Sequence, residues 1–277
     1  MHLAINYSLE ASDLLQEDMI KIDIFKCPEW PKMIADAILK CPVAVHFNLC
    51  AGRDMSKDID WDFVERLMLW TNTPHVNLHL ETRSKDIQNL SIDTEDPYLS
   101  DFIANQMITE LSLVVSRFGA EHVVAENVPY RSQGKVLYPS ADPDLVKNVI
   151  EAAGCGFLLD IAHARISAEN MGIDEIEYLN RLPVERLREL HFSGVHDLDG
   201  WLQDHLPAQV EDWQTLKWVL TQINRHEWPE PWLLALEYGG VGEKFAKRSD
   251  SQAIQQQVKH LRDILTLEPG STVSLKN

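Results

Sequence analysis

The sequence contains little cysteine, and its four thiols are scattered. They stand at positions 27, 41, 50 and 155, without a CxxC pair and without an even ladder of spacings. Disulfide frameworks and cysteine-ligated zinc sites both need thiols paired at regular spacings. The scarcity excludes a small disulfide-stapled scaffold and predicts reduced thiols.

The sequence also lacks a long apolar run. A membrane-spanning helix needs about 20 mostly apolar residues in succession, and no stretch of this chain approaches that length. The first residues, MHLAINYSLEASDLL, show no basic segment followed by a long apolar one, so they do not predict a signal peptide. We therefore expect no membrane association and a cytoplasmic location.

Positive charge is the third scarcity. Lysine and arginine number 25 against 43 aspartates and glutamates, which gives a formal net charge of −18. Proteins that bind nucleic acid usually neutralise its phosphates with a basic surface, so we expect no nucleic-acid partner. An acidic chain favours cationic partners instead, such as metal ions or a basic peptide.

What the sequence does contain is a regular alternation of short apolar runs and longer segments of helical period. Strands are predicted at residues 3–7, 20–25, 43–47, 76–80, 122–127, 156–160, 190–193 and 232–237. Helices are predicted at residues 11–17, 28–39, 60–71, 98–118, 142–153, 173–182, 213–224 and 253–266. This order predicts an α/β fold, a single (β/α)8 TIM barrel over residues 1–267, with a disordered tail at 268–277.

Histidine and acidic side chains gather where these predicted strands end. The set at the strand ends comprises His46, His79, Glu126, Asp160 with His163, His191 and Glu237, and the loop after the seventh strand adds Asp204 and His205. The C-terminal ends of barrel strands converge on one mouth. Because a buried acid or imidazole is costly unless it is paired or metal-bound, the sequence predicts a metal site there. A hydrogen-bonded polar plug is the alternative.

The ligand types limit which metal this site can hold. Mixed imidazole and carboxylate sets suit iron, zinc and manganese, and no thiolate lies among them. The set is larger than one ion needs, and carboxylates can bridge two ions. We therefore expect a multinuclear site of two or three ions.

Several segments carry a resemblance to a known family. The stretch LLDIAHARISAENMGIDEIEYLNRLPVERLRELHFSGVHD, together with VHFN, LHLE, ENVPY and ALEYGG, resembles the core of the multinuclear non-heme iron oxidases over most of the chain. The resemblance implies a xylose-isomerase-like barrel with two or three iron ions; zinc or manganese is the alternative. It also implies an oxidoreductase that uses dioxygen to modify residues such as cysteine in ribosomally made peptides.

Carried over residue by residue, the resemblance implies a set of metal ligands. These are His46, His79, Glu126, Asp160, His191, Asp204 and Glu237, with Asn127 as a ligand at the rim. The chain departs from the family in carrying His163 where members often have Asn-Asn, and in placing Asp204 directly beside His205. We count His163 and His205 among the candidate ligands, and His196 stays open. The expected catalytic residues are Glu126, Asp160, His163 and Glu237.

Two other groups on the same barrel remain as alternatives. Endonuclease IV shares the Asp-x-x-His arrangement and holds three zinc ions with a similar ordered set of ligands. Sugar isomerases and epimerases hold one divalent ion with a Glu, Asp, His, Glu set, which here is Glu126, Asp160, His191 and Glu237. That chemistry does not use the additional histidines and aspartate, so their presence favours the oxidase.

Three long polar loops are the expected walls of a substrate pocket. They span residues 81–97, 129–143 and 194–207, and long loops in compact domains are often functional. The expected substrate is a small peptide or another small molecule, and a partner protein that presents it is left open.

Overall fold

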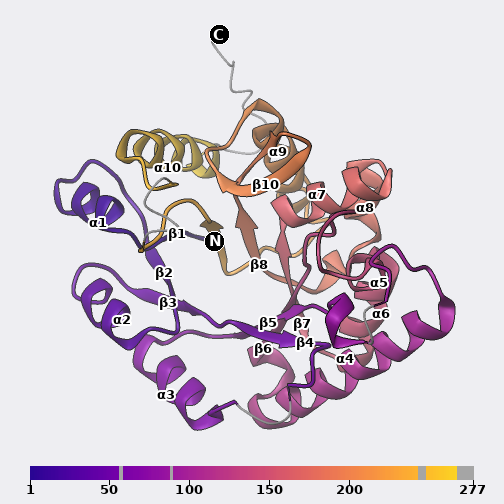
Figure 1. Cartoon of the computed structure of the whole chain (residues 1–277). Helices are drawn as coiled ribbons and strands as arrows, with labels where there is room; N and C mark the ends of the chain where they lie inside the picture. The colour runs from indigo at the N-terminus through magenta and orange to yellow at the C-terminus, as the bar shows by residue number, and fades with distance from the viewer. Residues whose placement is uncertain (56–58, 88–89, 243–247, 267–277) are drawn as a thin grey trace.

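The computed structural model describes residues 1–55, 59–87, 90–242 and 248–266. Nine parallel strands form one sheet in the order β3-β2-β1-β11-β8-β7-β6-β5-β4. Their bounds are β1 His2–Asn6, β2 Ile24–Pro28, β3 Val43–His46, β4 Leu49–Ala51, β5 Val76–Leu80, β6 Val123–Glu126, β7 Gly156–Asp160, β8 Leu187–Phe192 and β11 Leu233–Leu236. Figure 1 shows the sheet curled about a central axis with the helices outside it.

The sheet closes because β3 and β4 are two halves of one barrel strand. Only Phe47 and Asn48 separate them, and β3 pairs with β2 while β4 pairs with β5. Asn77 of β5 spans the break: its side chain accepts from the Phe47 amide (2.7 Å) and donates to the Phe47 carbonyl (3.1 Å). β1 joins β2 on one side to β11 on the other, and the pairing continues from β11 round to β4. Because β3 and β4 are continuous in the chain, the ring of strands is complete, and the predicted barrel is confirmed.

Each predicted strand and helix has a counterpart in the structure. The second strand is displaced, from the predicted 20–25 to Ile24–Pro28, because Ile20 is buried in the core without joining the sheet. The corresponding helices are α1 Leu9–Gln16, α2 Pro31–Ala37, α3 Trp61–Thr71, α4 Pro97–Phe118, α6 Pro143–Ala153, α8 Glu175–Arg181, α9 Val210–Asn224 and α10 Ser251–Thr266.

Several elements were not predicted. They are helices α5 (Tyr138–Ala141) and α7 (Ile161–Met171), the antiparallel pair β9 (Gly194–Leu198) and β10 (Trp201–Leu206), and the 3₁₀ turns η1 (Ser84–Asp86), η2 (Ala120–His122) and η3 (Val184–Arg186). The sequence does signal α7. Asp160 caps its N-terminus by accepting from the His163 amide, and Gly172 ends it in the left-handed conformation.

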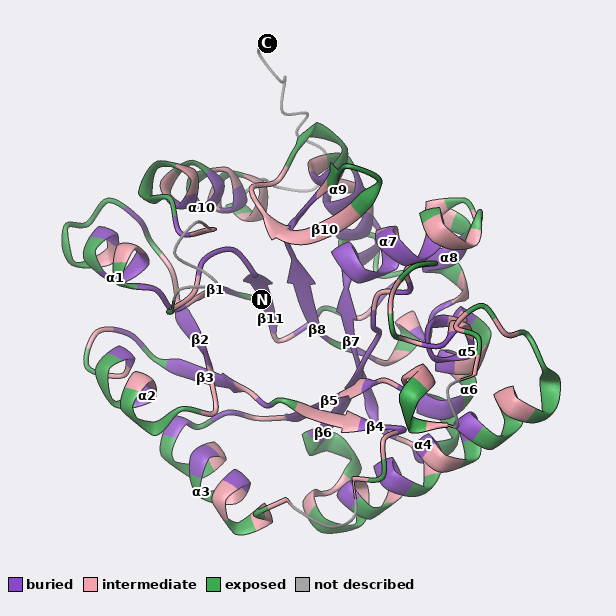
Figure 2. Ribbon diagram, viewed as in Figure 1, coloured by how far each residue is buried: buried purple, intermediate pink, exposed green. Residues whose placement is uncertain are grey.

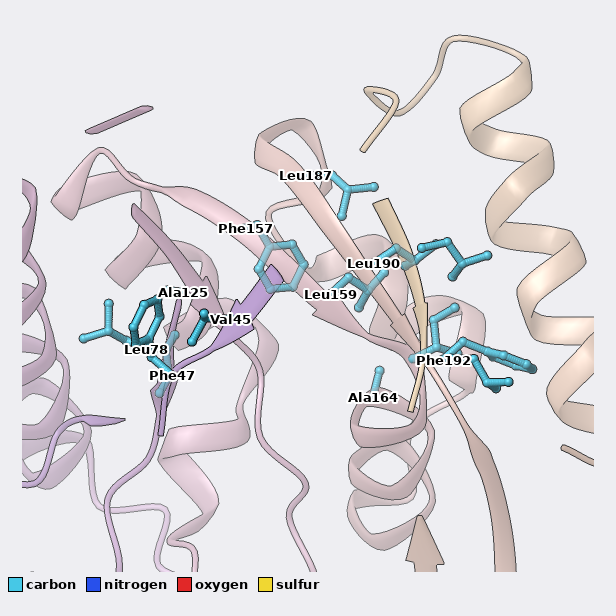
Figure 3. Packing of buried hydrophobic residues seen from close by; sticks show 14 of the residues in the cluster. Val45, Phe47, Leu78, Ala125, Phe157, Leu159, Ala164, Leu187, Leu190 and Phe192 are labelled. Atoms are coloured by element: carbon cyan, nitrogen blue, oxygen red, sulfur yellow. The ribbon is translucent and has the colours of Figure 1, made fainter. Parts of the chain in front are cut away.

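Successive residues of each strand face opposite sides of the barrel wall. On β1, Leu3 and Ile5 pack in the large core between sheet and helices, while Ala4 belongs to a separate small cluster. That small cluster also contains Ile24, Ala44, Leu233 and Ala235. Figure 3 shows part of the large core from close by. The apolar outer layer fixes the strands, so the inward positions are free to carry polar side chains.

The burial of residues also differs between the barrel strands and the outer faces of the helices. Figure 2 shows most of the barrel strands buried, the helices exposed on their outer faces, and β10 of intermediate exposure. Among the described residues, no helix is long and apolar enough to cross a membrane. The predicted disordered tail lies outside the described residues.

Candidate metal centre

The strand register brings the predicted ligands to one level of the barrel. His79 of β5 stands opposite Glu126 of β6, and Asp160 of β7 stands opposite His191 of β8. His46 ends β3, and Glu237 follows directly after β11. Parallel strands in register present their C-terminal residues at the same mouth.

Among the residues that the structure describes, four groups of three side chains have ligand atoms within 4.8 Å of one another. These are His46, His191 and Glu237; His46, His79 and Glu126; His163, Asp204 and His205; and Glu126, Asp160 and His163. The candidate His, Asp and Glu ligands of the sequence all occur in at least one group. Because the groups share members, they form one continuous site rather than four separate ones.

Glu126 lies at the junction of the groups. Its Oε2 is 3.3 Å from His79 Nε2 and 3.6 Å from His46 Nε2, and its Oε1 is 3.7 Å from both His163 Nδ1 and His191 Nδ1. Glu126 is 1% exposed, yet Oε2 has no hydrogen-bond partner. A buried carboxylate oxygen without a donor is costly, and a metal ion would satisfy it. The two oxygens face different histidines, so this carboxylate can bridge two ions.

Three histidines are held in the tautomer that metal binding requires. The Nδ1 atoms of His79, His163 and His205 contact the backbone carbonyls of Leu49 (3.2 Å), Asn127 (2.8 Å) and Glu237 (3.0 Å). A carbonyl accepts only, so each Nδ1 carries a hydrogen, and Nε2 is the nitrogen that can bind a metal whenever it is deprotonated. Metal-binding histidines usually have such a partner on the other nitrogen. The donor set therefore fits bound metal ions.

An irregularity in β10 brings the adjacent pair Asp204 and His205 to the same site. In a regular strand, neighbours point to opposite faces. Here the pairing of β9 with β10 shifts register between Gln203 and Leu206, and His205 has a positive φ of 56°. Bulges of this kind redirect side chains next to functional sites. Both residues thereby join His163 in one ligand group.

Two further candidates have other hydrogen-bond partners. Asn127 accepts from the Asp160 amide and donates to the Asp160 carbonyl, both at 2.9 Å. These bonds occupy its amide group and favour a role in positioning Asp160 over the rim ligand that the resemblance implies. His196 lies 2.7 Å from the Pro207 carbonyl and belongs to none of the four groups.

Burial and charge shift the pKa values of two candidate ligands in opposite directions. Burial lowers the pKa of His46 to about 3, so this imidazole is neutral and ready to bind metal. Burial opposes the charged form of His163 as well, but Asp160 and Asp204 outweigh it and raise the pKa of His163 to about 10. At neutral pH the metal-free protein therefore holds His163 as an imidazolium.

Metal binding is expected to release a proton from His163 and to strengthen as the pH rises. Because its folded-state pKa lies above the ordinary value, the His163 charge stabilises the metal-free protein fully below about pH 6.5, and this stability is lost as the pH rises through about 10. Metal competes with that proton, so apparent affinity should rise up to about tenfold per pH unit below pH 10. Zinc titrations at several pH values measure this slope, and a flat profile would contradict the assignment.

Replacing Asp160 by Asn, or Glu237 by Gln, is expected to remove bound metal while leaving the fold intact. Each carboxylate belongs to a ligand group, and residues at a barrel mouth serve function more than packing. Asn also caps helices as well as Asp does, so α7 should persist. Metal analysis with circular dichroism checks both points; full metal content in both variants would show that the site is assigned wrongly.

A cavity of about 660 Å³ opens over the candidate ligands. Its walls come from the start of α2, from Arg131, from β10 and from the segment after β11. Loops 129–143 and 194–207 thus contribute to it as expected, while no described residue of 81–97 does. Gly194 is required where the β9–β10 pair closes, because a Cβ there would collide with the Pro207 carbonyl.

Sequence reasoning missed two charged residues beneath the ligands, Lys26 of β2 and Glu189 of β8. Lys26 is 3% exposed and Glu189 4% exposed, and the two form an ion pair. A signal for Glu189 existed. It stands two residues before His191 in one strand, so the two side chains share a face.

The fold is a TIM barrel, and its mouth carries groups of side chains that could hold metal ions. Residues 106–234, a little under half of the chain, match the model of a family described as "RiPP precursor modification enzyme MbnB/TglH/ChrH". The match confirms the resemblance to the multinuclear non-heme iron oxidases, and with the ligand groups it supports a metal-dependent enzyme. The matched segment includes Glu126, Asp160, His163, His191, Asp204 and His205.

The chain is also similar to individual proteins. A UPF0276 protein of Acinetobacter baylyi is 24% identical over 197 residues, covering 68% of this chain and 65% of the relative. A UPF0276 protein of Acaryochloris marina is 36% identical over 73 residues, 26% of each chain. The matches thus span less than two thirds of these relatives.

Solved structures share the fold at low sequence identity. A D-psicose 3-epimerase crystallised with D-fructose has a TM-score of 0.57 at 11% identity, covering 98% of this chain and 100% of that one. Endonuclease IV from Thermus thermophilus has a TM-score of 0.52 at 13% identity, covering 96% and 99%. At this level of identity, the likenesses show the barrel fold alone.

Proposed function

We propose that this protein is an iron-dependent oxidase that uses dioxygen to modify a residue such as cysteine in a ribosomally made peptide. The observation that carries the proposal is the match of residues 106–234 to a RiPP precursor modification enzyme family, because most of the clustered ligands lie in that segment. The same proposal places the protein in the cytoplasm, where ribosomally made peptides arise.

The chain's own residues would hold two or three ions. Glu126 belongs both to the group with His46 and His79 and to the group with Asp160 and His163, so it would help to hold more than one ion. Bound iron would supply the redox chemistry with dioxygen as the oxidant. Glu126, Asp160, His163 and Glu237 are the proposed catalytic residues, since they lie among the ligand atoms that face the cavity or one another.

The cavity suits a short peptide segment. Trp30 and Trp201 stand at its rim, 52% and 39% exposed, and offer aromatic faces to a bound side chain. The Arg131 guanidinium lies 5.3 Å from the Trp201 ring and donates to Asp204 (3.3 Å). Arg131 thereby links the rim to a candidate metal ligand, and the open rim is compatible with a partner protein that presents the peptide.

Co-expression with a panel of short cysteine-containing peptides tests this function. Mass spectrometry should find one peptide with an altered mass, dependent on iron and dioxygen, and unaltered when Glu126→Gln replaces the native protein. Unaltered peptides throughout, combined with interconversion of ketohexoses by the manganese-loaded protein, would favour the epimerase alternative.

The epimerase alternative uses only part of the site. Glu126, Asp160, His191 and Glu237 would bind one divalent ion, and the barrel of the D-psicose 3-epimerase is similar. A single ion at that position does not need His163, Asp204 and His205 as ligands, so their grouping stays unexplained. The ordered tautomers of His163 and His205 favour the larger site.

Duplex DNA containing an abasic site is expected to be neither cleaved nor bound in a salt-sensitive manner, whichever metal is loaded. A nuclease of this fold must hold phosphates with basic side chains around the mouth. The β9–β10 segment contains no lysine or arginine, and the chain carries a net charge of −18. Cleavage at about one turnover per second or faster would contradict this prediction and indicate an endonuclease IV-like nuclease.

A further inference from the structure

Lys26, Glu189 and His191 form a buried charged cluster beneath the candidate metal centre. Their exposed fractions are 3%, 4% and 0%. The Lys26 ammonium contacts the Glu189 carboxylate and lies 2.7 Å from His191 Nε2. The same Nε2 lies 3.0 Å from Glu189 Oε1. Two opposite charges therefore compete for one ring nitrogen.

His191 differs from the other candidate histidines in what holds its tautomer. His79, His163 and His205 each direct Nδ1 to a backbone carbonyl. His191 instead directs Nε2 to charged side chains, and its Nδ1 has no hydrogen-bond partner. That Nδ1 lies 3.0 Å from Glu237 Oε1, close but without hydrogen-bond geometry. In the part of the chain that the structure describes, no backbone group decides which ring nitrogen carries the proton.

The ammonium and the carboxylate favour opposite tautomers. When Nε2 carries the hydrogen and donates to Glu189, Nδ1 keeps a lone pair that can bind a metal. When Nε2 accepts from Lys26 instead, Nδ1 carries the hydrogen and cannot bind a metal. The outcome decides whether the group of His46, His191 and Glu237 can hold an ion.

We propose that Glu189 is a positioning residue that holds His191 in the Nε2–H tautomer, and that its ion pair with Lys26 keeps the ammonium from donating to His191. One carboxylate oxygen engages both the ammonium and the ring, which leaves Nδ1 for an ion shared with His46 and Glu237. The inference rests on the metal binding proposed above. Outer partners of this kind typically alter metal affinity by about 10–100-fold.

The test combines single and double variants with zinc as the probe. Glu189→Met leaves Nε2 as the acceptor for Lys26, so one zinc ion per chain should be lost or bound about 10–100-fold more weakly. Lys26→Met with Glu189→Met removes both charges and frees the ring, so zinc binding should return. Lys26→Met alone leaves Glu189 with its Nε2–H partner and should keep the ion.

Nitrogen-15 spectra of the zinc-loaded protein with labelled histidine provide a readout that a merely structural role would not change. The His191 Nδ1 signal should shift to the metal-bound range in the native protein, the double variant and Lys26→Met, and not in Glu189→Met. A folded Lys26→Met variant without this signal, or a Glu189→Met variant that retains it, would overturn the proposal. Failure of the native protein to bind zinc or iron would instead overturn metal binding itself.

Discussion

Replacing Glu126 by Gln is expected to weaken metal binding more than about 100-fold and to abolish any activity that depends on bound metal. Loss of an outer partner costs about 10–100-fold, and Glu126 is a direct ligand candidate in two of the four groups. One of these groups contains His46 and His79, and the other contains Asp160 and His163. A neutral amide cannot bridge two ions, so the variant should lose more than one ion per chain.

The matched control for this variant is Glu110→Gln. Glu110 is likewise buried, at 7% exposure, but it lies on α4 and accepts a hydrogen bond from the Gly52 amide (2.7 Å). It belongs to none of the ligand groups. Equilibrium dialysis against zinc or ferrous iron should find native metal content in Glu110→Gln. Equal losses in both variants would mean that removing any buried carboxylate disturbs the barrel.

Removing the metal is expected to lower the melting temperature by roughly 8–16 °C. A ligand at 1,000 times its dissociation constant stabilises the folded state by about 4 kcal/mol, and each kcal/mol corresponds to roughly 2–4 °C for a large domain. Without metal, the buried carboxylates Glu126 and Asp160 belong to one group of ligand atoms within 4.8 Å, and among the described residues Glu126 Oε2 has no donor. Bound metal would thus offset the unfavourable free energy of burying these carboxylates.

Thermal melts with and without a chelator measure this difference. The Asp160→Asn variant should respond to the chelator much less than the native protein does. A native protein whose melting temperature is the same in both conditions would show that the clustered side chains hold no metal that contributes to stability.

The barrel could be predicted from the sequence because its strands are short apolar runs between helical segments. The run ending at Asp160 and the one ending near His191 were recognisable as strands for this reason. The split third strand was not foreseeable, because it depends on a contact between Asn77 and Phe47 across the break. The β9–β10 pair escaped because its residues are mostly polar and only partly buried.

Most candidate ligands were recognisable because they stand near the end of a predicted strand, and in a barrel such positions meet at one mouth. The grouping of Asp204 with His205 depended on a register shift that no sequence spacing reveals. Lys26 was missed because a lone lysine in an apolar run suggests solvent exposure, whereas its partner Glu189 lies far away in the chain. An ion pair between strands so far apart in the sequence forms only when the barrel has folded.

Metal analysis of aerobically purified protein, produced with iron supplied, tests the central claim most directly. We expect two or three iron ions per chain, with a coloured protein and an electron-resonance or charge-transfer signal. The overlapping ligand groups around Glu126 are the reason for more than one ion. One ion or fewer per chain, or a colourless protein containing only zinc, would contradict the proposal of a multinuclear iron oxidase.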